Sequence, residues 1–230
     1  MQLFFHPNIS STLVLDAVES QHCIKVLRHQ VGDEIHVIDG KGKIYSGTIA
    51  NQNHRRCEVH NIIEVRSEPQ TSHLHIAIAP TKSVDRLEWF VEKVTEIGVA
   101  QISLIKCDNS ERPRINTDRL EKKTISAIKQ NQSLWLPKIN ELKPFQSFIN
   151  DTITKQKLIA YVETKNESHH ISKLKMSKTD ETVILIGPEG DFSPQEVEMA
   201  INSGFEMVSL GKNVLRTETA GIVACALLST

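Results

Sequence analysis

The segment from Gly187 to Glu196 has the composition of a ligand-binding turn. It follows the apolar run at 183–186, which is typical of a buried central strand. Open α/β sheets bind ligands beyond the carboxyl ends of their strands, and glycine lets the backbone come close to a ligand. Glu189 lies between two such glycines, Gly187 and Gly190. The same residues also suit a tight turn in which the glutamate has no chemical role.

A second glycine loop carries two charged residues at the entrance of a helix. It runs from Leu210 to Gly221, after a predicted strand at 205–210. The helix that follows, 220–228, is apolar on nearly every side, so we expect it to be buried. An unpaired buried charge costs several kcal/mol. We therefore expect Arg216 and Glu218 to be paired or functional.

Common nucleotide and hydrolase motifs are missing from these loops. No G-x-x-x-x-G-K-[ST] phosphate loop occurs, and no G-x-G-x-x-G follows a strand. Gly40-Lys41-Gly42 leads into another strand and predicts a hairpin turn, while Ser193 is outside any G-x-S-x-G elbow. The cysteines lack the spacing of a zinc site, so we expect reduced thiols and no metal. They are Cys23, Cys57, Cys107 and Cys225.

Strands and helices alternate after residue 72, which predicts an α/β fold with a parallel sheet. Ser83 and Gly98 are the expected N-cap and stop of its first helix. Ser193, Pro194 and Glu196 form a capping-box signature for a later one. The predicted strands are 73–79, 99–105, 157–162, 182–186 and 205–210, and the helices are 83–97, 117–131, 194–204 and 220–228.

The first part of the chain has a different pattern of predicted secondary structure. Short alternating strands fill residues 31–65, with the hairpin at 39–42. A short helix is expected at 20–29, with Cys23, Val26 and Leu27 facing inward. These features predict a small β-barrel at 1–68, a linker, and a second domain at 73–230.

Composition fits an ordinary globular protein of 230 residues, with 39% hydrophobic and 24% charged residues. No apolar run is long enough for a membrane helix, and the first residues lack a basic export signal, so we expect a cytoplasmic protein. The net charge of −1 is not that of a typical nucleic-acid binder, although basic groups cluster locally. The clusters are Lys25/Arg28/His29, residues 54–56, Arg112/Arg114 and Arg119/Lys122/Lys123.

These motifs together resemble the 16S rRNA (uracil-nitrogen-3) methyltransferase family, which belongs to the SPOUT superfamily of trefoil-knotted methyltransferases. The most specific similarity lies in the two C-terminal loops, and weaker motifs extend over the whole chain. The C-terminal residues are Gly187-Pro188-Glu189-Gly190, Phe192-Ser193, Glu196, Leu210-Gly211 and Leu215-Arg216-Thr217-Glu218-Thr219-Ala220. The others are Lys93, Thr95-Glu96-Ile97-Gly98, Ser110-Glu111-Arg112, Gln132-Ser133, Val26-Leu27-Arg28 and Gly32-Asp33.

The resemblance implies an N-terminal PUA-like barrel that binds RNA and a C-terminal domain in which the last helix threads a deep knot. It also implies a homodimer that transfers a methyl group from S-adenosylmethionine to nitrogen 3 of one uridine in 16S rRNA, within the small ribosomal subunit. The residues placed by the resemblance to bind the cofactor are Val162, Ile186, Gly187, Glu189, Gly190, Leu210, Gly211, Leu215, Arg216 and Thr217.

Nitrogen 3 of uracil carries a proton at neutral pH, so this reaction needs a base or an anion-stabilising group. Arg216 is the candidate for stabilising charge on a uracil carbonyl oxygen. Glu189 or Glu218 could accept the proton or orient the arginine, and the sequence does not choose between them. RNA contacts are expected from Arg28, Arg112 and Arg114.

Two other functions fit the same residues. One is a related knotted methyltransferase that acts on tRNA or on a ribose hydroxyl. The other, from a different class, is an RNA-binding module without catalysis, although the intact glycine loops and Arg216 favour an enzyme.

The chain departs from the family pattern at three places. Asp191 replaces a second glycine, Pro113 replaces a serine, and Leu134-Trp135 replace an arginine-bearing sequence. Trp135 could stack on a base, but a tryptophan buried in the core is the more common case.

Overall fold

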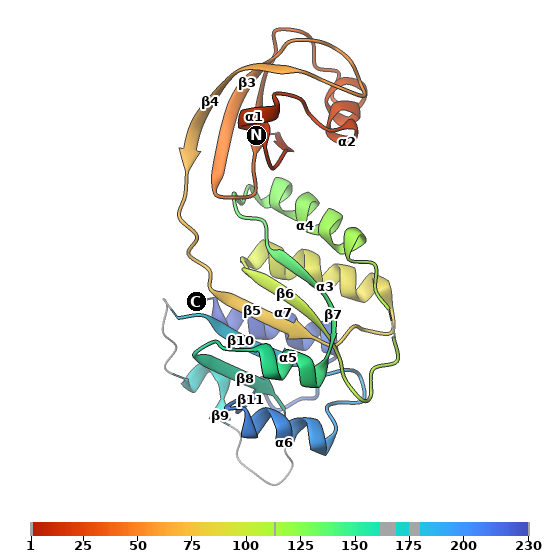
Figure 1. Ribbon diagram of the computed structural model, residues 1–230, viewed down its shortest axis with the longest axis vertical. Helices are drawn as coiled ribbons and strands as arrows, with labels where there is room; N and C mark the ends of the chain where they lie inside the picture. The colour runs from red at the N-terminus through yellow and green to blue at the C-terminus, as the bar shows by residue number, and fades with distance from the viewer. Residues whose placement is uncertain (1, 113, 162–168, 175–179, 230) are drawn as a thin grey trace. The chain divides into compact units, whose positions relative to one another are not determined.

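The computed structural model describes residues 2–112, 114–161, 169–174 and 180–229, and the chain forms two compact units (Figure 1). The first consists of Met1–Gln70 with Ile125–Leu136, and the second of Thr71–Thr124 with Pro137–Thr230. Residues 125–136, which lie inside the predicted range 73–230, pack with the first unit: Ile128 and Leu134 are buried in a cluster with apolar side chains of its sheet.

The first unit contains a four-stranded sheet in the order β1-β2-β3-β4. Strand β1 pairs with β2 in parallel, and the other pairs are antiparallel. The predicted hairpin is present, since β2 and β3 join through a turn in which Gly40 and Gly42 have positive φ. The elements are β1 (Leu3–Phe5), α1 (Ile9–Thr12), α2 (Ala17–Gln21), η1 (His22–Val26), β2 (Glu34–Ile38), β3 (Lys43–Ile49) and β4 (Val59–Ser67).

The helix expected at 20–29 lies a few residues earlier. It begins as α2 because the Asp16 side chain caps it and accepts a hydrogen bond from the backbone N–H of Glu19 at 2.8 Å. One turn of π-helix, η1, continues it. Cys23 is buried as predicted, but Val26 is 63% exposed, so the inward orientation predicted for Val26 is wrong.

The second unit contains a seven-stranded sheet, order β7-β6-β5-β10-β8-β11-β9, in which every described pairing is parallel. This confirms the predicted α/β fold with a parallel sheet. Its elements are β5 (Leu74–Ile78), α3 (Val84–Ile97), β6 (Gln101–Lys106), α4 (Thr117–Asn131, shared between the units), β7 (Lys138–Pro144), α5 (Phe145–Asp151), β8 (Gln156–Ala160), β9 (His169–His170), η2 (Ile171–Lys173), β10 (Thr182–Ile186), α6 (Pro194–Asn202), β11 (Glu206–Ser209) and α7 (Thr217–Leu228).

The alternation of side chains along the strands divides the core of this unit into two layers. Leu74, Ile76 and Ile78 of β5 face the layer that contains α3 and α7, whereas Ala77 and Ala79 face α5 and α6. Figure 1 shows the two pairs of helices on opposite faces of the sheet.

Helix α3 begins and ends where the sequence predicts. Ser83 occupies the N-cap position, but its side chain makes no capping hydrogen bond. Gly98 ends the helix with a φ of 108°, and its backbone N–H donates to the carbonyl of Val94. No helix in the described part of the chain is long and apolar enough to cross a membrane.

Helix α7 packs tightly against α3. A side chain added at Gly221 would collide with the ring of Phe90, so only glycine permits this approach. Gly221, Ala224 and Cys225 are buried, but Ala226 is exposed. The predicted burial of this helix therefore holds for the side that faces α3, while another side remains partly uncovered in a single chain.

Candidate functional site

A cavity of about 400 Å³ lies beyond the carboxyl ends of β8, β10 and β11 in the second unit. This is the edge of a parallel sheet at which ligands bind, and the volume is within the usual range for small-molecule sites. Its walls are formed by Ala160, Tyr161, Ile186, Gly187, Pro188, Glu189, Asp191, Val208, Leu210, Gly211, Asn213, Val214, Leu215, Arg216, Thr217 and Ala220.

Most of the residues that we predicted to bind a cofactor lie on these walls. They are Ile186, Gly187, Glu189, Leu210, Gly211, Leu215, Arg216 and Thr217. Gly190 is not on the wall; a Cβ at this position would lie 3.2 Å from the Cβ of Asn109. Val162 lies outside the described residues.

The walls also contain residues that the sequence reasoning did not select. Pro188, Asn213 and Val214 belong to the predicted loops, so naming whole loops would have included them. Ala160 and Tyr161 lie at the carboxyl end of β8, directly before Val162, the residue that the family resemblance had indicated there.

The loop after β10 is held by the helix that follows it. The predicted capping box is present: Ser193 Oγ accepts from the Glu196 backbone N–H at 3.3 Å, and Glu196 Oε2 accepts from the Ser193 backbone N–H at 2.9 Å. Glu196 Oε1 accepts from the backbone N–H of Asp108 at 2.9 Å. The buried glutamate therefore ties this loop to the loop after β6.

Asp191, one of the three departures, has a φ of 62°, in the left-handed region that favours glycine. Aspartate is among the few other residues that tolerate this region. Its Oδ1 accepts a hydrogen bond from the backbone N–H of Phe192 at 2.8 Å. The turn thus keeps a conformation suited to glycine. Pro113, at a second departure, lies outside the described residues.

Two of the three candidate catalytic residues lie on the cavity wall, and the third does not. Arg216 is at the N-cap position of α7, and its exposed side chain has no hydrogen-bond or ion-pair partner among the described residues. Glu189 Oε1 accepts from the backbone N–H of Lys82 at 2.9 Å. The side chain of Glu218 is 6% exposed and faces Arg86 of α3, with 3.8 Å between Oε1 and Nε.

Arg216 and Glu218, which we expected to be paired or functional, have different surroundings. Glu218 is buried and has a basic neighbour, although its Oε2 has no hydrogen-bond partner in the described structure. Arg216 is exposed, so the burial that we assumed for it is wrong. Within the described residues, no ion pair joins Arg216 to Glu189 or Glu218.

The three arginines predicted to contact RNA have different environments. Arg28 belongs to the first unit and is exposed, with a left-handed φ of 60°. Arg114 is exposed, and its side chain has no partner in the described part of the chain. Arg112 is half-buried, and its guanidinium donates to the carbonyl oxygens of Thr81 and Lys82.

Trp135, at the third departure, packs within the first unit. Its Nε1 donates to the carbonyl of Glu68 at 3.1 Å, and its ring lies where a side chain on Gly42 would be. These contacts favour the structural interpretation of this tryptophan over base stacking.

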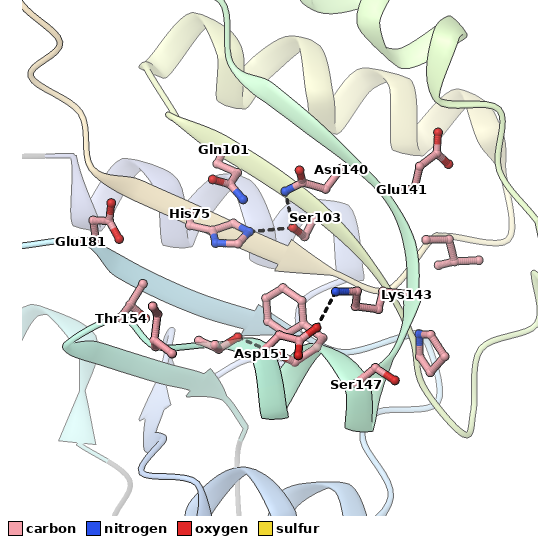
Figure 2. Close-up of a pocket in the computed structure, with 15 residues that line it drawn as sticks. His75, Gln101, Ser103, Asn140, Glu141, Lys143, Ser147, Asp151, Thr154 and Glu181 are labelled. Atoms are coloured by element: carbon pink, nitrogen blue, oxygen red, sulfur yellow. Dashed lines mark hydrogen bonds and ion pairs between the residues drawn. The ribbon is translucent and has the colours of Figure 1, made fainter.

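A second cavity, of about 700 Å³, lies against the amino halves of β5 and β6 and beside β7 and α5 (Figure 2). Three neighbouring strands contribute a hydrogen-bonded chain of side chains. Asn140 Nδ2 donates to Ser103 Oγ at 2.8 Å, and Ser103 Oγ lies 2.8 Å from His75 Nε2. Burial lowers the pKa of His75 to about 4, so this ring is uncharged at neutral pH.

At the rim of this second cavity, Lys143 and Asp151 form an ion pair at 2.7 Å, as Figure 2 shows. None of these residues was predicted, because positions 75, 103 and 140 become neighbours only through the register of the sheet.

Metal-binding groups are not apparent in the described ranges: no set of three or more His, Cys, Asp or Glu side chains is placed to hold an ion. The four cysteines are free and buried.

Comparison with known families matches both units. A model described as an RNA methyltransferase domain matches residues 67–229, and one described as an RNA methyltransferase PUA domain matches residues 15–60. The second match confirms the predicted PUA-like character of the first unit.

Individual relatives agree with these family matches. "Ribosomal RNA small subunit methyltransferase E" of Mesomycoplasma hyopneumoniae is 31% identical over 179 residues, which are 74% of this chain and 74% of that protein. A "probable rRNA-methyltransferase" from Porphyromonas gingivalis superposes with a TM-score of 0.88 at 41% identity, over 98% of this chain and 95% of that one. A "putative methyltransferase" from Legionella pneumophila, solved with the bound cofactor SAM, has a TM-score of 0.85 at 25% identity, over 99% and 96% of the two chains.

Proposed function

This chain belongs to the RNA methyltransferase domain family, and from that premise we propose that it is an rRNA methyltransferase that uses S-adenosylmethionine (SAM) and modifies nitrogen 3 of one uridine in 16S rRNA. One observation carries the proposal. Loops that follow three parallel strands form a single cavity, and its wall carries the carboxylate of Glu189 and an Arg216 side chain without a partner among the described residues. The names of the relatives support rRNA as the substrate, and the Legionella structure supports SAM.

The cavity fits this cofactor in size and in lining. Ile186, Leu210 and Leu215 provide an apolar surface for a flat adenine ring. Gly187 and Gly211 leave the main chain accessible for hydrogen bonds with the polar parts of the molecule. When bound, SAM supplies a methyl group that is already activated by the positive charge on sulfur. The reaction therefore has no need of a metal ion.

Methyl transfer to uracil nitrogen 3 requires loss of the proton on that nitrogen. Two carboxylates line the cavity, Glu189 and Asp191. Asp191 Oδ1 accepts a hydrogen bond from the Phe192 backbone N–H, and we assign Glu189 the role of proton acceptor. As the proton leaves, negative charge develops on the adjacent carbonyl oxygens, where the Arg216 guanidinium can stabilise it. Nitrogen 3 then forms a bond to the methyl carbon as the carbon–sulfur bond breaks and its electrons remain on sulfur. Glu218 lies off the cavity and faces Arg86, which favours a structural role for it.

The target base must be unpaired or extruded, because nitrogen 3 lies on the Watson–Crick edge of uracil. Phosphate contacts are assigned to Arg28 of the PUA-like unit and to Arg114, both of which are exposed. We propose that the RNA is presented within the small ribosomal subunit in the cytoplasm.

We further propose a homodimer with a knotted second domain of the SPOUT type, in which the PUA-like domain spans residues 1–68 and the knotted domain 73–230. The partly uncovered side of α7 supports the dimer, because Ile222, Val223 and Ala226 are not fully buried in one chain. The packing of α7, the last helix, against β5 and α3 supports a threaded C-terminal segment.

Two alternatives give different results in one experiment. A related methyltransferase would modify tRNA or a ribose hydroxyl, and an RNA-binding module would bind RNA without transferring a methyl group. Purified protein is incubated with labelled SAM and either small ribosomal subunits or tRNA, and the modified nucleoside is identified by mass spectrometry. We expect 3-methyluridine at one position of 16S rRNA. A methylated ribose, a modified tRNA or no transfer would contradict the proposal.

A further inference from the structure

The guanidinium of Arg112 donates hydrogen bonds to the protein backbone. Its Nε donates to the carbonyl oxygen of Thr81 at 3.3 Å, and its Nη2 donates to the carbonyl oxygen of Lys82. Arg112 lies in the segment after β6, and Thr81 and Lys82 lie in the segment between β5 and α3. A guanidinium held by two carbonyls is less available to a phosphate than that of Arg114, which has no partner in the described structure.

The carbonyl of Thr81 and the backbone N–H of Lys82 belong to one peptide group. This N–H donates to Glu189 Oε1 at 2.9 Å. Arg112 therefore binds the oxygen end of a planar peptide group whose hydrogen end binds Glu189. Donation to the oxygen polarises the peptide and strengthens its N–H as a donor. Fixing the oxygen also fixes the direction in which the N–H points.

The same segment after β6 holds the other side of Glu189. Asn109 Nδ2 donates to the carbonyl oxygens of Gly190 and Asp191, each at 3.0 Å. Thr81 is fully buried, and its hydroxyl donates to the carbonyl of Ser83 at 2.6 Å, which stiffens the turn on which Arg112 acts. Glu189 is thus held on both sides by the loop that contains Arg112.

We propose that Arg112 is a positioning residue for Glu189, acting through the Thr81–Lys82 peptide group, and is not primarily an RNA contact. The inference rests on the proposed function, in which Glu189 accepts the nitrogen 3 proton. Arg112 therefore fixes the direction of the N–H that holds the Glu189 carboxylate on the cavity wall.

A double-mutant cycle separates positioning from RNA binding. The methyl-transfer rate is measured under single-turnover conditions for wild type, Arg112→Ala, Glu189→Gln and the double variant. We expect Arg112→Ala to lower the rate about tenfold or more, as part of the roughly 10²–10⁴-fold that a positioned base supplies. In the Glu189→Gln background the same change should have little further effect, because the group that it positions is gone.

Two further readouts distinguish positioning from a general loss of structure. In Arg112→Ala the transfer rate should fall while the dissociation constant for RNA stays near that of wild type, because this side chain holds the Thr81–Lys82 peptide group and not a phosphate. Arg112→Lys, which keeps the charge, should recover part of the rate. Arg114→Ala is the matched comparison: it should weaken RNA binding and reduce its salt dependence.

Additive losses in the cycle, together with weakened RNA binding in Arg112→Ala, would overturn the proposal. The result does not depend on which nucleotide is methylated, so an error in the substrate would not conceal it. If the protein transfers no methyl group at all, the proposed function fails, and positioning is measured by amide hydrogen exchange at Lys82. Faster exchange in Arg112→Ala but not in Arg114→Ala supports the contact, and equal exchange rates contradict it.

Discussion

The second unit contains two cavities that differ in what forms their walls. The cavity beyond the carboxyl ends of β8, β10 and β11 is lined mainly by loops, with the glycines Gly187 and Gly211 and a charged Arg216 that has no partner in the described structure. The cavity at the amino halves of β5 and β6 is lined by strand side chains, and His75, Ser103 and Asn140 bond to one another. Groups that already have partners stabilise the fold, whereas groups without partners are available to a ligand. Substitutions at the first cavity should therefore change the reaction, and substitutions at the second should change stability.

The largest expected effect concerns Arg216. Arg216→Ala should lower the rate of methyl transfer by about 10²–10³-fold, the usual cost of removing one charge-stabilising donor. The thermal unfolding midpoint should stay the same, because this exposed side chain has no partner among the described residues. Single-turnover rates and calorimetry measure the two quantities. Lys212→Ala, in the same loop but off the cavity wall, is the control. Equal rates for both variants would remove Arg216 from the mechanism.

Acid should destabilise the protein through the second cavity. The pKa of His75 is lowered from about 6.5 to about 4 by burial. Above pH 6.5 the ring is uncharged in both folded and unfolded chains. Between pH 6.5 and 4 only the unfolded chain takes up the proton. The free energy of unfolding should therefore decrease by up to about 3 kcal/mol as the pH is lowered through this range.

The variant His75→Gln isolates this effect, since glutamine can bond to Ser103 but does not titrate. Urea unfolding of both proteins from pH 7 to pH 4 should show a steeper decline in wild type. Parallel curves would show that His75 is not held uncharged.

Removing the hydroxyl of Ser103, the middle of the three hydrogen-bonded side chains, should lower stability less than acid does and should leave methyl transfer unchanged. Ser103→Ala leaves His75 Nε2 and Asn140 Nδ2 without their shared partner. We expect a loss of about 1–3 kcal/mol in the free energy of unfolding at neutral pH. Ser147→Ala, an exposed position in the same cavity, should change it little. A Ser103→Ala protein of normal stability and reduced methyl transfer would reverse the assignment of the two cavities.

The smallest effect concerns the turn at Asp191. Its left-handed φ of 62° costs a residue with a β-branched side chain roughly 1–2 kcal/mol, whereas glycine has no such penalty. Asp191→Val should therefore lower the thermal midpoint, and Asp191→Gly should leave it nearly unchanged. A lower midpoint for the glycine variant would show that the Asp191 hydrogen bond to Phe192 matters more than the backbone conformation.

The carboxyl-end cavity could be predicted from the sequence because its signals are local. A buried strand, a glycine loop and a capping box follow one another directly between 182 and 196. Loops that follow parallel strands lie at the same edge of the sheet, and the family resemblance indicated the chemistry. The exposure of Arg216 was misjudged, because an apolar helix does not show which of its sides remains uncovered.

Features that depend on distant pairings could not be predicted. Strand β7 is half exposed at the edge of the sheet and ends in Pro144, so it lacks the apolar run that reveals a central strand. The chain of His75, Ser103 and Asn140 depends on the register of three strands. The partners of Arg112 belong to a loop about thirty residues earlier; a charge is visible in a sequence, but its partner is not.

We expect the loop-lined cavity, and not the larger cavity lined by strand side chains, to bind the methyl donor. A crystal of this protein soaked with SAM distinguishes the two cavities. Electron density for the cofactor should lie against Gly187, Leu210 and Leu215, and none should lie beside His75. Density beside His75 alone, or an empty loop-lined cavity at a saturating concentration of SAM, would contradict this expectation.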